Sequence, residues 1–288
     1  MASPPATPPA ELPADIQSWR FKDTGAPCEW AEEYRPGGFH PVNLGDTFHA
    51  GKYRVIRKLG DGSNSTVWLA VNTERPRYVA LKIMVAKASN TNTELAILNH
   101  LSKLAPEDTK SQRVNVLLDA FQHQGVNGKH QCLVFELMGA TANSKVEELP
   151  ENKPKMYGKR QRYPRWMAKK LLVHALRGLA FLHENGIVHG DMQPGNLLFS
   201  MKDIEHAEED TLKQDETHTA IPIHRLDRKT DRWAPSTLYL KQPLYDYVEL
   251  GSKLCVKISD LGSAFWSTNP PNDTVTPISL CAPELTFY

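Results

Sequence analysis

Two short segments constrain the fold of this chain more than any other feature of its sequence. The first is His189-Gly190-Asp191-Met192-Gln193-Pro194-Gly195-Asn196, and the second, Asp260-Leu261-Gly262, follows further along the chain. Together they provide one carboxylate that can accept a proton and two hard oxygen ligands, from Asn196 and Asp260. Phosphoryl transfer requires this set of groups. The two segments therefore predict a site that holds a nucleoside triphosphate with Mg²⁺.

A glycine-containing segment lies upstream, from Leu59 to Val67. Its glycines, Gly60 and Gly62, let backbone N–H groups approach phosphates because no Cβ stands in the way. The alternating apolar residues around them indicate two paired strands. Lys82 lies in an apolar run over 78–85 that predicts a buried strand, so its ammonium group needs a partner there.

A helix over 89–104 is expected to supply that partner. Its helical periodicity comes from Ile97, Leu98, Leu101 and Leu104, and Asn90, Thr91 or Asn92 is expected to cap its start. Glu94 in this helix would hold Lys82 against the α- and β-phosphates. These motifs occur in the order that is typical of a protein kinase. The order is the glycine loop, the strand lysine, the helix glutamate, the His-x-Asp loop and Asp-Leu-Gly, followed by Ala282-Pro283-Glu284.

The bulk properties fit this hypothesis. The chain has 288 residues, 40% of them hydrophobic, and a net charge of +1, so neither a nucleic-acid nor a membrane partner is expected. Four scattered cysteines argue against a disulfide framework and a zinc site. No apolar run reaches the length of a membrane span, and the N-terminus lacks a signal sequence. We expect the cytosol or the nucleus; the oligomeric state is not predicted.

The predicted fold class is α+β, a bilobal arrangement of a small β-rich lobe with one main helix and a mostly helical second lobe. We expect a disordered Pro-rich tail over 1–28, the first lobe over 29–138 and the second lobe over 139–288. An insertion over roughly 200–250, acidic in its first half, is expected to be a mobile solvated loop, with attraction of arginine-rich peptides as the alternative.

Two further elements are expected within these lobes. The segments 114–121 and 131–138 predict a hairpin that ends in a hinge. By position, Phe135 would face the rear of a nucleotide pocket, and the backbone of Glu136 and Met138 would bind adenine; for both apolar side chains, ordinary core packing is the alternative. A long helix over 165–185, stopped by Gly186, is expected to have a broad apolar face formed by Met167, Leu171, Leu172, Ala175, Leu176, Leu179 and Leu182.

Several stretches outside the catalytic motifs carry a more specific resemblance, which covers residues 34–288. They are 34–46, Ser65-Thr66-Val67-Trp68-Leu69, 116–121, Gly125-Val126-Asn127-Gly128, 134–136, and Asp260-Leu261-Gly262 with Ala264 and Trp266. In these stretches the chain resembles the SR-protein kinases, which phosphorylate serines in Arg/Ser-rich splicing factors, and in particular their divergent short forms from filamentous fungi.

The resemblance implies a role for each matching residue. Asp191 would accept the proton of a serine hydroxyl, Asn196 and Asp260 would hold Mg²⁺, and Lys82 with Glu94 would clamp the phosphates of ATP. His189 would be structural. The residues implied for the nucleotide site are Leu59, Gly60, Asp61, Gly62, Ser65, Val67, Ala80, Lys82, Phe135, Glu136, Met138 and Leu198. The implied cofactors and partners are ATP, Mg²⁺ and Arg/Ser-rich protein substrates.

Three features depart from the kinase pattern. Gln193 stands where kinases place a lysine that neutralises the γ-phosphate, so slow catalysis, or a pseudokinase scaffold without transfer, is one alternative. Gly190 replaces an arginine that contacts a phosphorylated activation segment, so control through Thr274, Thr276 or Ser279 is not expected. The chain stops at Tyr288, from which we expect an incomplete second lobe with apolar surface of the long helix exposed.

A second alternative comes from the same catalytic loop. The segment His189 to Asn196 also resembles the loop of the aminoglycoside and choline phosphotransferases, which transfer phosphate without the missing lysine. Small-molecule phosphorylation is therefore a third hypothesis. The Asp-Leu-Gly and Ala-Pro-Glu motifs weigh against it, because they are features of kinases with peptide substrates.

Overall fold

The structure is a computed structural model that describes residues 6–13, 15–75, 77–90, 93–104, 111–154, 161–272, 276 and 280. The chain divides into two compact units. The first contains Met1–Thr91, Leu118–Leu137 and Ile204–Pro243, and the second contains Asn92–Leu117, Met138–Asp203 and Leu244–Tyr288. The predicted lobe boundaries, 29–138 and 139–288, differ from these units in two segments. Residues 92–117 belong to the second unit and residues 204–243 to the first.

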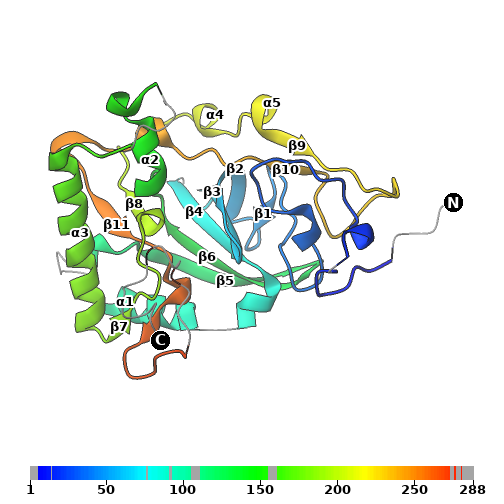
Figure 1. Ribbon diagram of the computed structural model, residues 1–288, viewed down its shortest axis with the longest axis horizontal. Coiled ribbons are helices and arrows are strands. Elements are labelled where there is room, and N and C mark those ends of the chain that lie inside the picture. The colour runs from blue at the N-terminus through cyan, green and yellow to red at the C-terminus, as the bar shows by residue number, and fades with distance from the viewer. Residues whose placement is uncertain are drawn as a thin grey trace. The chain divides into compact units, whose positions relative to one another are not determined.

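A six-stranded sheet with the strand order β1-β2-β3-β4-β6-β5 lies in the first unit (Figure 1). Its strands are β1 Thr47–Phe48, β2 Tyr53–Asp61, β3 Ser65–Asn72, β4 Arg77–Met84, β5 Leu117–Gly125 and β6 Gly128–Glu136. The structure confirms the strands predicted on either side of the glycine loop, the strand that carries Lys82, and the hairpin. The turn of the hairpin is shorter than predicted, because only Val126 and Asn127 stand between the end of β5 and the start of β6.

One face of this sheet forms the core of the first unit. Trp68, Leu81 and Val134 are each at most 1% exposed, and the register pairs Trp68 with Leu81 and Leu81 with Val134. Directly paired residues share a face of a sheet, so these three side chains form one row. Burial of such apolar rows is a main contribution to the stability of the sheet.

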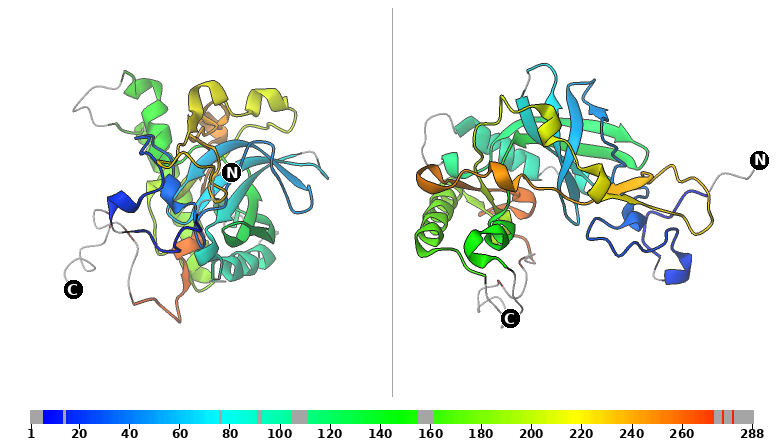
Figure 2. Two further views of the ribbon diagram at one scale, coloured as in Figure 1. Left: turned by 90° about the vertical axis from the view of Figure 1, so that its right-hand side faces the viewer. Right: turned by 90° about the horizontal axis from the view of Figure 1, so that it is seen from above.

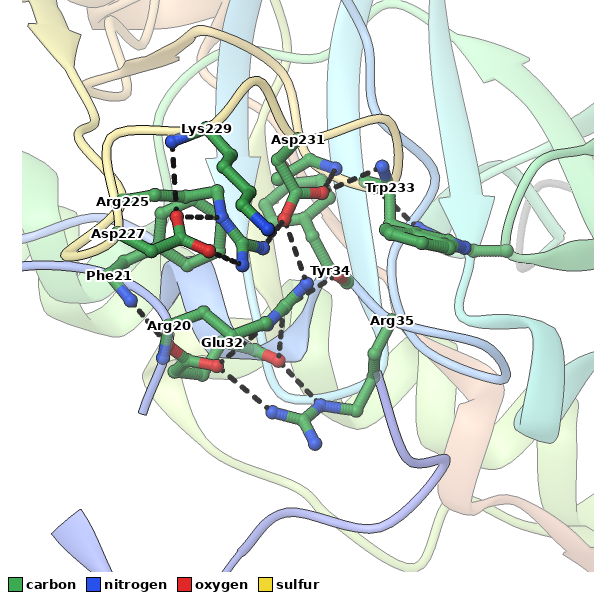
Figure 3. A network of polar contacts seen from close by, with 12 residues as sticks. Arg20, Phe21, Glu32, Tyr34, Arg35, Arg225, Asp227, Lys229, Asp231 and Trp233 are labelled. Carbon is green, nitrogen blue, oxygen red and sulfur yellow. Dashed lines mark hydrogen bonds and ion pairs between the residues drawn. The ribbon is translucent and has the colours of Figure 1, made fainter. Parts of the chain in front are cut away.

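The N-terminal segment packs against the insertion, although the two are far apart in sequence. Phe21 is 6% exposed and forms a β-bridge with Arg225. Arg20 pairs with Glu32 and with Asp231, and Arg225 pairs with Asp231 as well (Figure 3). The part of the predicted tail that begins at Arg20 therefore packs against other segments of the first unit. From Arg20 onward, aromatic and charged side chains find partners in a segment that composition does not reveal.

The insertion is ordered where it was expected to be mobile. It contains α4 Glu209–Leu212 and α5 Glu216–Thr219, followed by an antiparallel pair, β9 Ala220–Pro222 and β10 Thr237–Tyr239. Leu212 is fully buried, and the Glu209 carboxylate accepts two hydrogen bonds from Arg54 of β2, at 2.9 and 2.7 Å. In Figures 1 and 2 the segment is drawn in yellow. The sequence predicts solvated acidic residues here, but Glu209 binds Arg54 of the sheet.

The second unit contains the longer helices and two short antiparallel ladders. The helices are α1 Thr93–Leu104, α2 Ala142–Glu148 and α3 Arg165–Glu184. The ladders pair β8 Leu197–Phe199 with β11 Val256–Ile258, and β7 Ile187–Val188 with β12 Phe265–Trp266. None of the helices in the described part of the chain combines the length and apolar composition of a membrane span.

The long helix α3 confirms the predicted helix but not all of its predicted apolar face. It ends before Gly186, which has φ of +70°, as a glycine stop requires. Leu171 is buried, whereas Leu172 and Leu176 are 65% and 64% exposed. One residue along a helix turns the side chain by about 100°, so a face that includes 171, 172, 175 and 176 was too broad. Exposed apolar surface on this helix was expected and is confirmed. Leu104, the last residue of α1, is 42% exposed.

Candidate active site

Five of the predicted nucleotide-site residues share one face of the sheet in the first unit. The register pairs Gly60 with Val67, Val67 with Lys82, and Ala80 with Phe135. Lys82 and Ala80 lie two positions apart on β4 and therefore point to the same face. This face is opposite to the buried Trp68 row, and Val67, Lys82 and Phe135 are only half-buried on it. These five residues contribute small and apolar side chains together with the cation of Lys82.

The turn between β2 and β3 leaves room beside its glycines. The Gly62 N–H donates to the Ser65 carbonyl at 3.0 Å, which closes the turn. A Cβ built on Gly60 or Gly62 would meet no atom within 4 Å, and neither residue has a positive φ. The fold itself therefore does not require glycine at either position. Close approach of a ligand to the backbone is the remaining physical reason for it.

In the second unit, Asp191, Gln193 and Asn196 form one hydrogen-bonded group. Gln193 Nε2 donates to Asp191 Oδ2 at 2.8 Å. Asn196 Nδ2 donates to the same oxygen at 3.0 Å and to the Asp191 carbonyl at 2.8 Å. Asp191 Oδ1 is buried, and no donor among the described residues reaches it. Two donors thus fix the orientation of the carboxylate, and its Oδ1 has no donor among the described residues.

The residues before Asp191 shape this loop. Gly190 has φ of +78°, and a Cβ on it would lie 2.2 Å from the Ser263 carbonyl oxygen, so this backbone excludes an arginine. His189 Nε2 lies 3.1 Å from the Ser259 carbonyl, and its Nδ1 accepts from the Asp191 N–H at 3.3 Å. Burial lowers the pKa of His189. A neutral ring that bonds backbone on both sides has the structural role that was predicted.

The predicted metal ligands lie at one end of the β8–β11 ladder. Leu197 pairs with Ile258, and the next residue, Ser259, donates its N–H to the Asn196 carbonyl at 2.9 Å. Asp260 follows with φ of +61° and an exposed side chain. A positive φ is uncommon outside glycine and often marks a functional position. The ladder thus brings the backbones of Asn196 and Asp260 to the same end.

The donor chemistry of these two residues fits Mg²⁺. Asn196 uses its amide nitrogen toward Asp191. Its amide oxygen and the carboxylate of Asp260 are both hard oxygen donors in type. Mg²⁺ is commonly held by one or two protein oxygens, with substrate phosphates and water completing the octahedron. Within the described ranges, no group of three His, Cys, Asp or Glu side chains could hold a metal.

Glu94 lies close to the Asp-Leu-Gly motif within the second unit. Glu94 is 5% exposed, and a Cβ on Gly262 would lie 3.3 Å from Asp260 Oδ1 and 3.6 Å from Glu94 Oε2. Lys82 belongs to the first unit, so its pairing with Glu94 stays a prediction. Met138, which is buried, and Leu198, which pairs with Lys257, belong to the second unit.

Some predicted features fall outside the described residues. These are the helix caps Thr91 and Asn92, the Ala282-Pro283-Glu284 motif, and the phosphorylation candidates Thr274 and Ser279. Thr276 is described, and its hydroxyl donates to the Gly190 carbonyl at 2.9 Å. The expectation about activation-segment phosphorylation therefore stays a prediction.

Lys58, a charged residue next to the glycine loop, is not among the residues predicted from the sequence. It has no exposed surface, and its ammonium group contacts Glu29, Asp61 and the Tyr239 carbonyl. The signal was present, because a lysine inside the apolar alternation of β2 needs a carboxylate for the same reason as Lys82. The partner was not recognisable, since Glu29 was assigned only to the start of the first lobe.

Comparisons with known proteins agree with this geometry. The model of the protein kinase domain family matches residues 53–213. Protein kinase dsk1 of Schizosaccharomyces pombe is 38% identical over 174 residues, which are 59% of this chain and 30% of that protein. SRSF protein kinase 3 of Homo sapiens is 35% identical over 176 residues, 60% of this chain and 29% of that protein. These matches confirm the predicted resemblance to the SR-protein kinases.

Two further matches bear on length and fold. A serine/threonine protein kinase of Aspergillus fumigatus is 32% identical over 233 residues, 77% of this chain and 53% of that protein. The crystal structure of a kinase domain superposes with a TM-score of 0.55 at 18% identity, covering 85% of this chain and 60% of the other. The chain thus spans between about a third and a half of these three relatives. The predicted α+β, bilobal kinase fold is confirmed, and the chain belongs to the protein kinase family.

Proposed function

We propose that this chain is an ATP-dependent serine/threonine kinase that transfers the γ-phosphate of ATP to serine in Arg/Ser-rich proteins. The observation that carries the proposal is the carboxylate of Asp191. Its Oδ2 accepts hydrogen bonds from Gln193 and Asn196, while its buried Oδ1 has no donor among the described residues. A carboxylate with this geometry can accept the proton of a substrate hydroxyl.

In the proposed reaction, the serine oxygen forms a bond to the γ-phosphorus, and the bond from that phosphorus to the bridging oxygen breaks, so that ADP leaves. The hydroxyl proton passes to Asp191 Oδ1. Bound Mg²⁺ would neutralise phosphate charge, held by Asn196 and Asp260. Lys82 contributes a positive charge toward the α- and β-phosphates, and the open backbone at Gly60 and Gly62 admits the phosphates.

Gln193 has a role that the kinase pattern does not suggest. A lysine at this position would place a positive charge near the γ-phosphate. Gln193 carries none, and it orients Asp191 through a hydrogen bond of 2.8 Å. Loss of one preorganised charge lowers a rate by roughly 10²- to 10³-fold, so slow transfer is expected. This neutral residue is also the observation that favours the alternative, a nucleotide-binding scaffold without transfer.

The substrate class rests on the relatives rather than on the surface charge of this chain. Several carboxylates of the acidic insertion already have cationic partners, among them Glu209 with Arg54 and Asp210 with Lys213. We therefore base the preference for Arg/Ser-rich substrates on the similarity to SRSF protein kinase 3. We also propose that the chain acts in the cytosol or the nucleus; its described cysteines, Cys28, Cys132 and Cys255, are free thiols.

The test is transfer of labelled γ-phosphate to a synthetic Arg-Ser repeat peptide, with a Lys-Ser repeat as the comparison. Asp191→Asn should lower transfer by at least about 10²-fold, because the proton acceptor is lost. Asp246→Asn changes an exposed aspartate of the same unit and should leave transfer unchanged. A signal that is the same in wild type and Asp191→Asn would contradict the kinase and favour the scaffold. Equal transfer to both peptides would contradict the substrate class alone.

A further inference from the structure

Lys58 is a completely buried cation located two residues before the first glycine of the loop. Its ammonium group donates to the Glu29 carboxylate and to the Tyr239 carbonyl, the latter at 2.9 Å, and it lies 3.4 Å from Asp61 Oδ1. The side chains of Glu29 and Asp61 are themselves only 3% and 15% exposed. A buried ammonium group is tolerated only with such partners. Three segments of the chain therefore meet at this lysine.

The backbone around Lys58 is bound by the insertion. Strand β1 pairs with β2 only at Tyr53 and Arg54, so the same edge of β2 is open further along. There, Gln214 donates its N–H to the Ile56 carbonyl at 3.0 Å and accepts from the Lys58 N–H at 2.9 Å through its side chain. Gln242 donates its N–H to the Lys58 carbonyl at 2.9 Å. The insertion thus fixes the end of β2 immediately before the glycine loop.

Asp61 places a negative charge between the two glycines of a loop that is proposed to receive phosphates. The register pairs Asp61 with Thr66 and Lys58 with Trp68. Thr66 and Trp68 are buried on the core face, opposite to the face that carries Gly60, Val67 and Lys82. The Asp61 carboxylate is therefore on the core side of the sheet, where Lys58 is the cation beside it.

We propose that Lys58 is a positioning residue for the glycine loop. It holds Asp61 on the core side, away from the phosphates, and anchors the loop to the N-terminal segment and to the insertion. The inference rests on the proposed binding of Mg·ATP to this loop. Without Lys58, the Asp61 carboxylate is free to turn toward the nucleotide face and repel the phosphates, and the loop loses its anchor.

The test compares ATP with adenosine, which lacks phosphates, in calorimetric titrations with Mg²⁺ present. Lys58→Met should weaken ATP binding by about tenfold, the effect of one unit charge at partly screened separation from a phosphate, with adenosine affinity unchanged. The double variant Lys58→Met/Asp61→Asn should bind ATP as tightly as the wild type. Lys58→Arg, which keeps the positive charge, should also bind ATP with wild-type affinity. Unchanged ATP affinity in Lys58→Met, an equal loss for ATP and adenosine, or no rescue by Asp61→Asn would overturn the proposal.

A second measurement separates this inference from the proposed function. Amide hydrogen exchange of residues 59–65 is followed in the nucleotide-free protein, where Lys58→Met should accelerate exchange and Asp61→Asn should not. If the wild-type protein bound no Mg·ATP, the proposed function would be refuted. The role of Lys58 as an anchor of the loop would then be judged from the exchange of residues 59–65 in Lys58→Met. If Lys58→Met does not fold, Gln214→Ala replaces it, because it removes the bond to the Lys58 N–H and should accelerate the same amides. If exchange of residues 59–65 were unchanged in Gln214→Ala, the proposal would again be overturned.

Discussion

Asn127 connects three distant segments of the first unit, and its replacement by alanine should destabilise that unit strongly. Asn127 is 2% exposed and lies in the turn of the β5–β6 hairpin. Its side-chain amide donates to the Phe39 carbonyl at 2.6 Å and to the Trp233 carbonyl at 2.7 Å. The hairpin is thereby joined to the N-terminal segment and to the insertion.

The magnitude follows from these two bonds. Asn127→Ala leaves two carbonyls of buried residues without this donor, and each such loss costs about 1–3 kcal/mol. We expect a loss of about 3 kcal/mol in the free energy of unfolding, near the lower part of the summed range, because water can reach a vacated site at a turn. With a urea m-value of about 2 kcal/mol/M, the unfolding midpoint should fall by about 1.5 M.

Urea unfolding followed by tryptophan fluorescence measures this change, since Trp233 and Trp68 both lie in the affected unit. The control is Val126→Ala, which changes the neighbouring turn residue, 48% exposed, and should alter stability by less than about 0.5 kcal/mol. If Asn127→Ala were no more destabilising than Val126→Ala, the two hydrogen bonds would not stabilise the unit as argued here.

Three further predictions concern other parts of the chain. Leu171→Ala should lower the free energy of unfolding by about 2–4 kcal/mol, and Leu172→Ala by less than about 0.5 kcal/mol. Similar urea midpoints for the two variants would contradict the burial of Leu171 and the exposure of Leu172 on α3. Gly190→Ala should cost more than about 2 kcal/mol, because φ is positive and Ser263 blocks a Cβ, whereas Gly62→Ala should shift the melting temperature little; the reverse order would contradict the loop geometry. Burial, reinforced by two neighbouring histidines, lowers the pKa of His40 to about 3. The unfolded chain binds a proton at His40 near pH 6.5, and the folded chain does not. The free energy of unfolding therefore has its full value above about pH 6.5. It falls by up to about 1.4 kcal/mol per pH unit as the pH is lowered toward about 4.5. His40→Gln should flatten that slope in urea titrations; an unchanged slope would exclude His40 as its cause.

Much of the candidate site was predictable because its parts are local. The separation of Asp191 from Asn196 and the position of Asp260 two residues before Gly262 are fixed by the chain itself. The β-strand around Lys82 followed from its apolar run, and α3 followed from its periodicity and from Gly186. The orientation of Asp191 was not predictable, because the sequence does not show that the Gln193 amide folds back to donate to the Asp191 carboxylate.

Propensity, periodicity and motif spacing act over a few residues at a time, so the sequence alone was enough to predict the strands around the glycine loop, the strand that carries Lys82, the helices α1 and α3, and the family of the chain. Contacts between distant segments were needed to establish three further features. The insertion packs on the sheet, Arg20 and Phe21 pack against the insertion, and Lys58 is buried beside Glu29 and Asp61. These contacts join segments separated by tens to hundreds of residues. Their partners are selected by complementary charge and shape in three dimensions, and a composition or a period along the chain carries no record of that selection.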